Sequence, residues 1–409
     1  MLERYFEKET GNKVVQSIPL SAFAGKRVAI DISVYFYSKM ATSKKALSGD
    51  NNFYCETPDE VQVMRRALQD IFKSLQTFLK YGILLVIVFD GTPHELKNKC
   101  KEKRADSKEK ATKKFNTLTE KLTSDPDMPY LGDQIRKAYL GINSVPKTFK
   151  EMCVDMVKAL GLPCIFADDF GLMTKDAEGV CACLSYNGLI DATYTIDSDY
   201  HTYGGNVAIK KIDMVKTGSG YVHMCQVRDI GRILNLRQMP FNCFQDLCIL
   251  LGTDFNDNIT GNGLVANWNF IYEYGTIEYF IREKRIDVED PEHELFRFRE
   301  VQQMFRCTQR VIPDPKFKLC IDTFNSKGVQ YLTEMGLEQE VQRTYSAYMS
   351  INAGLAKAAH VSSSGIATST ATNASSTSTS NSVSGQQVYL DPNTSVKNDF
   401  INAFRQMKL

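Results

Sequence analysis

Residues 83–89 (ILLVIVF) constrain the fold most, because every residue in this run is apolar. With Gly82 it is the longest apolar run in the sequence, yet a membrane span needs about 20 such residues. A strand with one face in water would instead alternate apolar and polar residues. We therefore expect a strand that is buried on both faces, as in the centre of a parallel sheet.

Segments typical of strands and of helices alternate around this run. Further strands are expected at 26–32, 191–196 and 206–210, and amphipathic helices at 61–81 and 147–160. Strands that alternate with helices indicate an α/β fold with a mainly parallel central sheet flanked by helices.

The first of these helices has a recognisable start in residues 57–60 (TPDE). Thr57, with Glu60 three positions later, forms a capping box, and Pro58 suits the first helical position. The sequence therefore places the N-cap of this helix at Thr57.

The composition changes along the chain and predicts four parts. An α/β core at 1–240 should include a highly charged helical segment at about 95–140, and a mostly helical region should follow at 241–355. Residues 356–390 are rich in Ser and Thr and almost without charge, so we expect a flexible linker there. A short tail at 391–409 follows it.

The bulk composition excludes some classes of protein. The chain has 43% hydrophobic residues, and 49 Lys and Arg stand against 48 Asp and Glu. Uniform disorder and a strongly basic nucleic-acid coat are therefore excluded, whereas a nucleic-acid enzyme is not, because net charge says nothing about its distribution. Eleven cysteines without a framework spacing, and no visible signal peptide, lead us to expect a reducing, intracellular compartment.

Acidic residues stand at the ends of the predicted strands and near the starts of short helices. Taken singly, each is explained as a helix cap or a turn residue. Gathered in the crevice beyond the carboxyl ends of the strands, they would repel one another unless divalent cations were bound. Oxygen-only ligation favours Mg²⁺ or Mn²⁺, and two such ions suit phosphodiester hydrolysis. The set is Asp31, Asp90, Asp176, Glu178, Asp197, Asp199 and Asp254.

A basic run follows the strand that ends at Asp90. It holds nine Lys or Arg residues against three acids. A solvated surface helix is the plain explanation of such a run. Because the run leaves directly from an acidic strand end, it can also overhang the expected metal site and bind phosphates. Its basic residues are Lys97, Lys99, Lys101, Lys103, Arg104, Lys108, Lys110, Lys113 and Lys114.

Five segments resemble, in order, the signature sequences of the flap endonuclease / xeroderma pigmentosum G family of structure-specific 5′ nucleases. The resemblance extends over residues 20–345 and implies a PIN-like fold with a helical arch and a C-terminal helix-two-turn-helix region. The departures from the family suit a viral or protist member as well as an animal one. The segments are VAIDISVYFY, VFDGTPHELKNKCKEKR, KDAEGVCACL, TIDSDYHTYG and DLCILLGTDFNDNITGNG.

The resemblance also implies roles for individual residues. The seven acids would bind two Mg²⁺ ions, with Mn²⁺ as a substitute, and Asp199 would also count as catalytic. Lys97 and Arg104 would contact the scissile phosphate, and the neighbouring Lys101 and Lys103 would bind DNA. Tyr37 would stack on a base beside the cut, although a core aromatic is its plain alternative. Gly261 and Gly263 would bind duplex phosphates in a hairpin together with K⁺.

The activity implied is that of a flap endonuclease or 5′–3′ exonuclease acting on branched or flapped DNA in replication, repair or recombination. A monomer in the nucleus, or in the replication compartment of a virus, is expected. A sliding clamp is a further candidate partner, although the tail has no clear clamp-binding motif. The alternatives are a junction resolvase or double-strand 5′ exonuclease of the same family, an RNA-directed nuclease, and a non-catalytic DNA-binding scaffold on the same fold.

Two departures from the family pattern affect the expected site. Asp176 and Glu178 form the central pair of acids in this set. The family usually has Glu at the position of Asp176, whose side chain is one methylene shorter. The span from Gly161 to Asp176 is also longer than usual, so the loop before this acid is expected to differ from that of other members.

Overall fold

The structure is a computed structural model that describes residues 14–48, 57–125, 131–142, 144–218, 220–258, 263–284, 297–306, 308, 313 and 326–337. The chain divides into two units, Met1–Tyr348 and Met349–Leu409, and every described residue belongs to the first. The predicted linker and tail therefore lie outside the described residues, and the predicted domain boundaries stay predictions.

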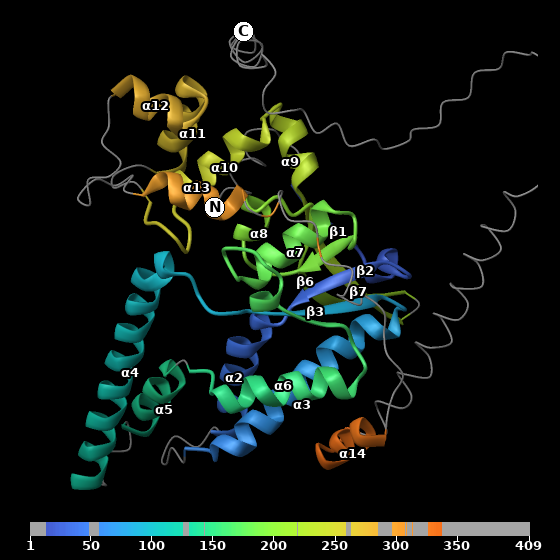
Figure 1. Cartoon of the computed structure of the whole chain (residues 1–409). Coiled ribbons are helices and arrows are strands. Elements are labelled where there is room, and N and C mark those ends of the chain that lie inside the picture. Colours follow the sequence, from blue (N-terminus) through green and yellow to red (C-terminus); the bar gives the residue numbers. More distant parts are fainter. Residues whose placement is uncertain are drawn as a thin grey trace, which may run out of the picture. The chain divides into compact units, whose positions relative to one another are not determined.

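The described strands form one mixed sheet in the order β1-β7-β6-β5-β2-β3-β4 (Figure 1). Neighbours from β6 to β4 are parallel, whereas β7 is antiparallel to both β6 and β1. The strands are β1 (Val15–Pro19), β2 (Arg27–Asp31), β3 (Leu84–Phe89), β4 (Cys164–Phe166), β5 (Ala192–Tyr194), β6 (Val207–Thr217) and β7 (Gly220–Asp229).

Helices cover the sheet and continue beyond it. Among the described residues, no helix is both long and apolar enough to cross a membrane. The α-helices are α2 (Ser33–Leu47), α3 (Glu60–Lys80), α4 (Asn98–Ser124), α5 (Leu131–Gly141), α6 (Lys147–Ala159), α7 (Ala177–Tyr186), α8 (Asp199–Thr202), α9 (Ile230–Arg237), α10 (Phe241–Leu250), α11 (Leu264–Tyr274), α12 (Ile277–Lys284), α13 (Phe298–Arg306) and α14 (Ser326–Glu334). The short 3-10 helices are η1 (Leu20–Phe23), η2 (Glu95–Lys97) and η3 (Ala167–Asp169).

The prediction of a doubly buried strand is confirmed by β3. It pairs in parallel with β2 and with β4, and Leu85 to Phe89 are buried. Leu85 and Ile87 face a core shared with α3 and α6. Val86 and Val88 are equally buried but lie outside that core cluster, and α7 contacts β3 from the other face. Figure 1 shows α3 and α6 on one side of the sheet and α7 on the other.

The antiparallel part of the sheet was not predicted. The strand expected at 206–210 is β6, which runs on to Thr217 because it pairs with β7 over its whole length. Neither β1 (VQSIP) nor β7 (GYVHMCQVRD) has a continuous apolar run, since both strands keep many side chains at least partly exposed. The prediction of a mainly parallel sheet holds for the five strands from β6 to β4.

The predicted start of α3 is wrong. Its N-cap is Asp59, whose side chain accepts a hydrogen bond from the Gln62 amide at 3.2 Å, and the helix begins at Glu60. Asp is as good an N-cap residue as Thr, and its carboxylate also favours the positive end of the helix dipole. The residues before it, Thr57 and Pro58, are therefore not part of the helix.

The charged segment predicted at about 95–140 forms η2, α4 and α5. Helix α4 buries only Leu118, which packs with Leu131, Ile135 and Ala138 of α5. Figure 1 shows α4 and α5 side by side, and their contacts confirm this. Most of α4 is therefore solvated, so a polyanion can reach its basic side chains.

The helical region after residue 240 is joined around the buried carboxyl of Asp246 in α10. Its two oxygens accept hydrogen bonds from the Ile277 amide at 2.9 Å and from the Gln302 side chain at 3.0 Å. One buried side chain in α10 thus binds both the start of α12 and the side of α13. Because a buried donor left without its acceptor is costly, this contact matters for the stability of the region.

Asp246 predicts a dependence of stability on pH. Burial raises its pKa from 3.8 to about 6, against the lowering effect of its hydrogen bonds. The folded chain therefore holds this proton more tightly than the unfolded chain does. The stability it contributes is present below pH 4 and is lost as the pH rises through about 6.

We expect Asp246→Asn to become more stable relative to the wild type as the pH rises from 5 to 8, by about 1.4 kcal/mol. The amide of Gln302 can turn to accept from the new Asn, so the variant should fold. Free energies of unfolding in urea at both pH values would measure this. Exposed Asp106, changed to Asn, is the control, and an equal pH effect in both variants would contradict the prediction.

Candidate metal and phosphate site

Three parallel strands bring their acids to one edge of the sheet. Strand β2 ends in Asp31, Asp90 follows β3 directly, and Asp197 lies shortly after β5. The order β5-β2-β3 makes these strands neighbours. Because carboxyl ends of parallel strands meet at one edge, the three acids lie near one another. The electrostatic influence of Asp90 and Asp197 on Asp31 agrees with this placement.

Hydrogen bonds orient the first two of these acids. Asp31 accepts from the Ser33 amide at 3.0 Å and from the Thr195 hydroxyl at 3.4 Å. Asp90 accepts from the Ala177 amide at 2.9 Å and from the Ser33 hydroxyl. The amides of Ser33 and Ala177 are the first of α2 and α7, so both carboxylates face the positive ends of helices.

The central pair stands at the start of α7. Asp176 is the N-cap residue and is buried, with its Oδ2 accepting from the Tyr203 hydroxyl at 2.8 Å and from the Thr174 hydroxyl. Glu178 lies in the first turn of the helix and interacts electrostatically with Asp31, Asp90, Asp197 and Asp176. The shorter Asp176 therefore still belongs to the cluster.

Asp197, Asp199 and Asp254 complete the set. The Asp199 amide, first in α8, donates to Asp197 at 2.9 Å, and the Asp254 amide lies 3.5 Å from the Asp199 carboxylate. Asp254 comes from the connection between α10 and α11, so the helical region reaches the edge of the sheet at this point. The structure brings all seven predicted acids together, while their roles as ligands stay a prediction.

The crowding of these acids changes their proton affinity. Burial, with the nearby charges of Asp90 and Asp197, raises the pKa of Asp31 to about 8. Burial and the charge of Asp197 raise the pKa of Asp199 to about 8 as well. Burial and four neighbouring acids raise the pKa of Glu178 well above its usual value. A cation placed among these groups would remove the repulsion.

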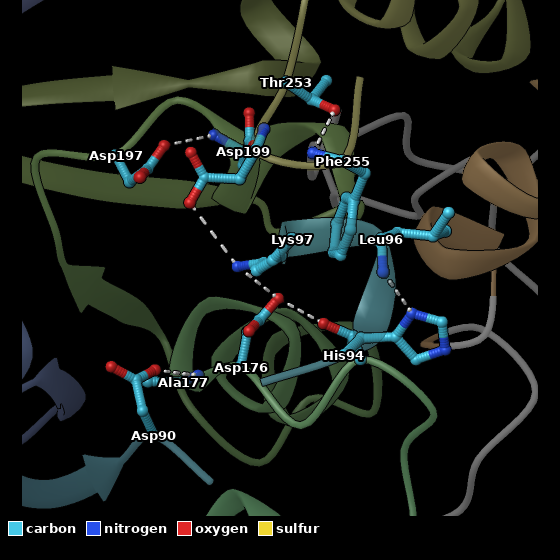
Figure 2. A network of polar contacts seen from close by, with 12 residues as sticks. Asp90, His94, Leu96, Lys97, Asp176, Ala177, Asp197, Asp199, Thr253 and Phe255 are labelled. Atoms are coloured by element: carbon cyan, nitrogen blue, oxygen red, sulfur yellow. Dashed lines mark hydrogen bonds and ion pairs between the residues drawn. The ribbon is translucent and has the colours of Figure 1, made fainter. Parts of the chain in front are cut away.

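Lys97 supplies a positive charge to the cluster. Its Nζ lies 2.9 Å from a carboxylate oxygen of Asp176 and 3.6 Å from one of Asp254. The same Nζ lies over the ring of Phe255, 4.9 Å from the ring centre. Figure 2 shows Lys97 directed toward Asp176, with Asp197 and Asp199 on the opposite side of its ammonium. Burial alone would lower the pKa of Lys97, but Asp176, Glu178 and Asp254 outweigh it and raise that pKa.

Other basic residues at the base of α4 also reach the connection that carries Asp254. Arg104 lies 3.3 Å from Asp254. Lys99 and Lys103 both contact Asp257, at 2.5 and 2.6 Å. Lys101 is exposed, with its Nζ 3.5 Å from the Asn98 side chain. Lys97 and Arg104 therefore both contact Asp254, and their proposed contact with a phosphate stays a prediction.

The remaining predicted residues are Tyr37 and the two glycines. Tyr37 in α2 is 51% exposed, whereas Tyr35 and Phe36 are buried, so Tyr37 is not a core residue. Burial lowers the pKa of Arg104, but Asp254, Cys100 and Tyr37 outweigh it and raise that pKa. Gly263 is the exposed N-cap residue of α11, and Gly261 lies outside the described residues.

The cluster fits a hard divalent cation by its chemistry. As the side chains stand, no three acidic, His or Cys groups among the described residues form a ready-made metal cage, and Lys97 contacts two of the acids instead. The donors are nonetheless carboxylate oxygens only, several of them buried with raised pKa values. Such a set suits Mg²⁺ or Mn²⁺ better than a softer metal.

Sequence reasoning missed the hydroxyl groups that orient the acids. Ser33, Thr174 and Thr195 each stand two residues from an acid of the cluster, and all three donate to a cluster carboxylate. Only Thr174 donates to the acid two residues away, whereas Ser33 donates to Asp90 and Thr195 to Asp31. A Ser or Thr two positions from a strand-end acid would have been a usable signal.

Two family models match this chain. The XPG N-terminal domain matches residues 5–111, and the XPG I-region matches residues 172–254. Together they include all seven acids, Tyr37, Lys97 and Arg104.

Curated relatives are similar over most of this chain. Flap endonuclease 1 of Cryptosporidium parvum (strain Iowa II) is 28% identical over 314 residues, which is 74% of this chain and 59% of that protein. Flap endonuclease 1 of Phytophthora infestans (strain T30-4) is 28% identical over 280 residues, which is 68% of this chain and 67% of that protein. Against the first of these relatives, the match therefore spans less than two thirds of the relative's length.

Solved structures share the fold. Flap endonuclease-1 from Methanococcus jannaschii has a TM-score of 0.53 and 17% identity, covering 82% of this chain and 96% of that chain. The catalytic core of Rad2 in complex with a DNA substrate has a TM-score of 0.50 and 18% identity, covering 83% of this chain and 98% of that chain. At these identities the likeness shows the fold, a central sheet flanked by helices as in PIN-like nucleases.

Proposed function

Since this chain belongs to the XPG and flap endonuclease family, we propose that it is a metal-dependent, structure-specific 5′ nuclease. Its substrate would be DNA with a 5′ flap or a recessed 5′ end, and the reaction the hydrolysis of a phosphodiester. One observation carries the proposal: two basic residues from the base of an exposed helix lie over seven gathered carboxylates.

The carboxylates would hold the metal, and two Mg²⁺ ions are proposed. Asp31, Asp90 and Glu178 influence one another's charge state, as Asp199 and Asp254 do, and Asp197 influences Asp31, Glu178 and Asp199. When bound, such ions lower the pKa of water and stabilise charge on the leaving oxygen. The hydroxyls and helix N-termini keep the carboxylates in place, so little reorganisation accompanies the reaction.

The basic side chains would bind the phosphate. Lys97 and Arg104 already contact carboxylates, so an incoming phosphate would replace one anion by another at the same groups. Tyr37 would stack on an unpaired base, and its exposure supports this role. Lys101 and Lys103 of α4 would extend the contact along the DNA single strand. Gly263 at the start of α11 would contact phosphates of the DNA duplex.

A cleavage assay would test the proposal directly. We expect an end-labelled 5′ flap DNA to be cut in Mg²⁺ and to stay intact in EDTA. A nicked duplex, a four-way junction and a flap made of RNA should be run beside it, because preference for one of these would assign the same site to an exonuclease, a resolvase or an RNA-directed nuclease. Tight binding of every DNA without any cleavage in Mg²⁺ would overturn the proposal in favour of a scaffold.

A further inference from the structure

The segment from η3 to Lys175 directly precedes Asp176 in the chain. It lies against the residues that follow Asp90. The segment therefore touches both loops from which Asp90 and Asp176 arise. None of the roles assigned above involves it.

Asp168 in η3 binds the loop after Asp90 through its carboxylate. One oxygen accepts from the Thr92 amide at 2.9 Å, and the other lies 3.3 Å from the Thr92 hydroxyl. Lys175 adds its ammonium at 3.4 Å from Asp168. The carbonyl of Lys175 in turn accepts from the Gly91 amide at 2.9 Å. Both amides after Asp90 thus donate to the segment 168–175.

The packing at Gly91 shows how closely the two loops approach. A Cβ on this residue would lie 2.7 Å from the Asp168 carboxyl carbon and 2.8 Å from the Asp168 nitrogen. Only glycine leaves room for this approach. On the other side, Lys175 has a φ of +51°, a conformation that non-glycine residues rarely adopt. Such a conformation persists where the surrounding contacts hold it.

These contacts reach the cluster through one peptide bond on each side. Gly91 follows Asp90, and Lys175 precedes Asp176. Asp90 also accepts from the Ala177 amide at 2.9 Å, which joins the same two loops on the side of the site. A shift of the loop 90–92 would therefore move Asp90 relative to the start of α7.

We propose that Asp168 is a positioning residue that fixes the distance between Asp90 and Asp176 by binding Thr92 and Lys175. It touches neither a substrate nor the reacting atoms. Its ion pair with Lys175 is 42% and 43% exposed and is weak in water, so the main contribution comes from the Thr92 amide. The kinetic part of this inference rests on the proposed nuclease function, whereas the structural part does not.

Two measurements without a substrate test the inference. In Asp168→Ala, hydrogen exchange at residues 90–92 should become faster, and the affinity for Mn²⁺, followed by its electron paramagnetic resonance signal, should fall about tenfold. Asp168→Asn keeps an oxygen for the Thr92 amide and should restore most of both. Asp169→Ala is the matched control, because this exposed neighbour shares η3 and makes none of these contacts.

The kinetic test separates positioning from a general loss of structure. In Asp168→Ala, kcat on flap DNA should fall about tenfold with KM within about twofold, since the basic contacts to DNA are unchanged. Exchange and Mn²⁺ affinity equal to those of Asp169→Ala would overturn the inference. If the wild type cuts no DNA, the proposed function fails, and the exchange and Mn²⁺ measurements still decide the role of Asp168.

Discussion

Asp199→Asn is expected to lower the rate of flap cleavage at least about a thousandfold, which corresponds to about 4 kcal/mol of transition-state stabilisation. The change removes the negative charge that Asp199 would carry with a cation bound, and it alters the shape of the side chain very little. The Asn side-chain oxygen can still accept from the Asp254 backbone amide, and the backbone amide of residue 199 can still donate to Asp197. The fold should therefore survive while the cluster loses a ligand for a divalent cation.

DNA affinity should change little in this variant. The basic contacts at Lys97 and Arg104 remain, and one fewer negative charge faces the phosphates. Single-turnover rates in Mg²⁺, together with DNA binding in Ca²⁺, would measure the two effects separately. Asp155→Asn in α6 makes the same chemical change at an exposed position and should behave as the wild type. Wild-type turnover in Asp199→Asn would refute the assignment of the cluster as the metal site.

The acidic cluster could be predicted because it follows from a rule about sheets. Once residues 26–32 and 83–89 are placed in one parallel sheet, Asp31 and Asp90 stand at the same edge, and the structure shows that their strands are neighbours. The approach of Asp254 from a separate helical region does not follow from that rule. The resemblance to a known family supplied it, and the contacts of Asp254 with Lys97 and Arg104 agree.

Features set by tertiary contacts could not be predicted. Strand β7 has little apolar periodicity, and it becomes a strand because β6 and β1 offer it backbone partners on both sides. The sequence predicts Thr57 as the N-cap of α3, whereas the structure uses Asp59, because two good capping residues stand within three positions. The pairing of Asp168 with Thr92 joins residues far apart in sequence, and no local pattern indicates it.

Lys97→Met should show what the ammonium contributes to both stability and reaction. In the wild type this group lies between Asp176 and Asp254 and is only 17% exposed. Without it, two carboxylates of the cluster lose their cation. Because removing one partner of a largely buried ion pair leaves an uncompensated charge, we expect the metal-free variant to lose about 3–5 kcal/mol of stability.

Divalent cations should restore part of this loss. A cation that binds the folded chain and not the unfolded one stabilises the fold, and the variant should gain more from it than the wild type does, because its cluster has no competing ammonium. Thermal unfolding in EDTA and in Mg²⁺ would measure the difference. Lys73→Met in α3 is the matched control, since its pair with Asp70 is at the surface.

Turnover should not recover with stability. The proposed contact of Lys97 with the scissile phosphate would stabilise charge only in the transition state, and the loss of one such group costs about 100- to 1000-fold in kcat. A variant that is as stable as the wild type in EDTA would show that the ammonium does not neutralise the cluster. A variant stabilised by Mg²⁺ but inactive would instead assign Lys97 two separable roles, one in balancing the carboxylates and one in binding the phosphate.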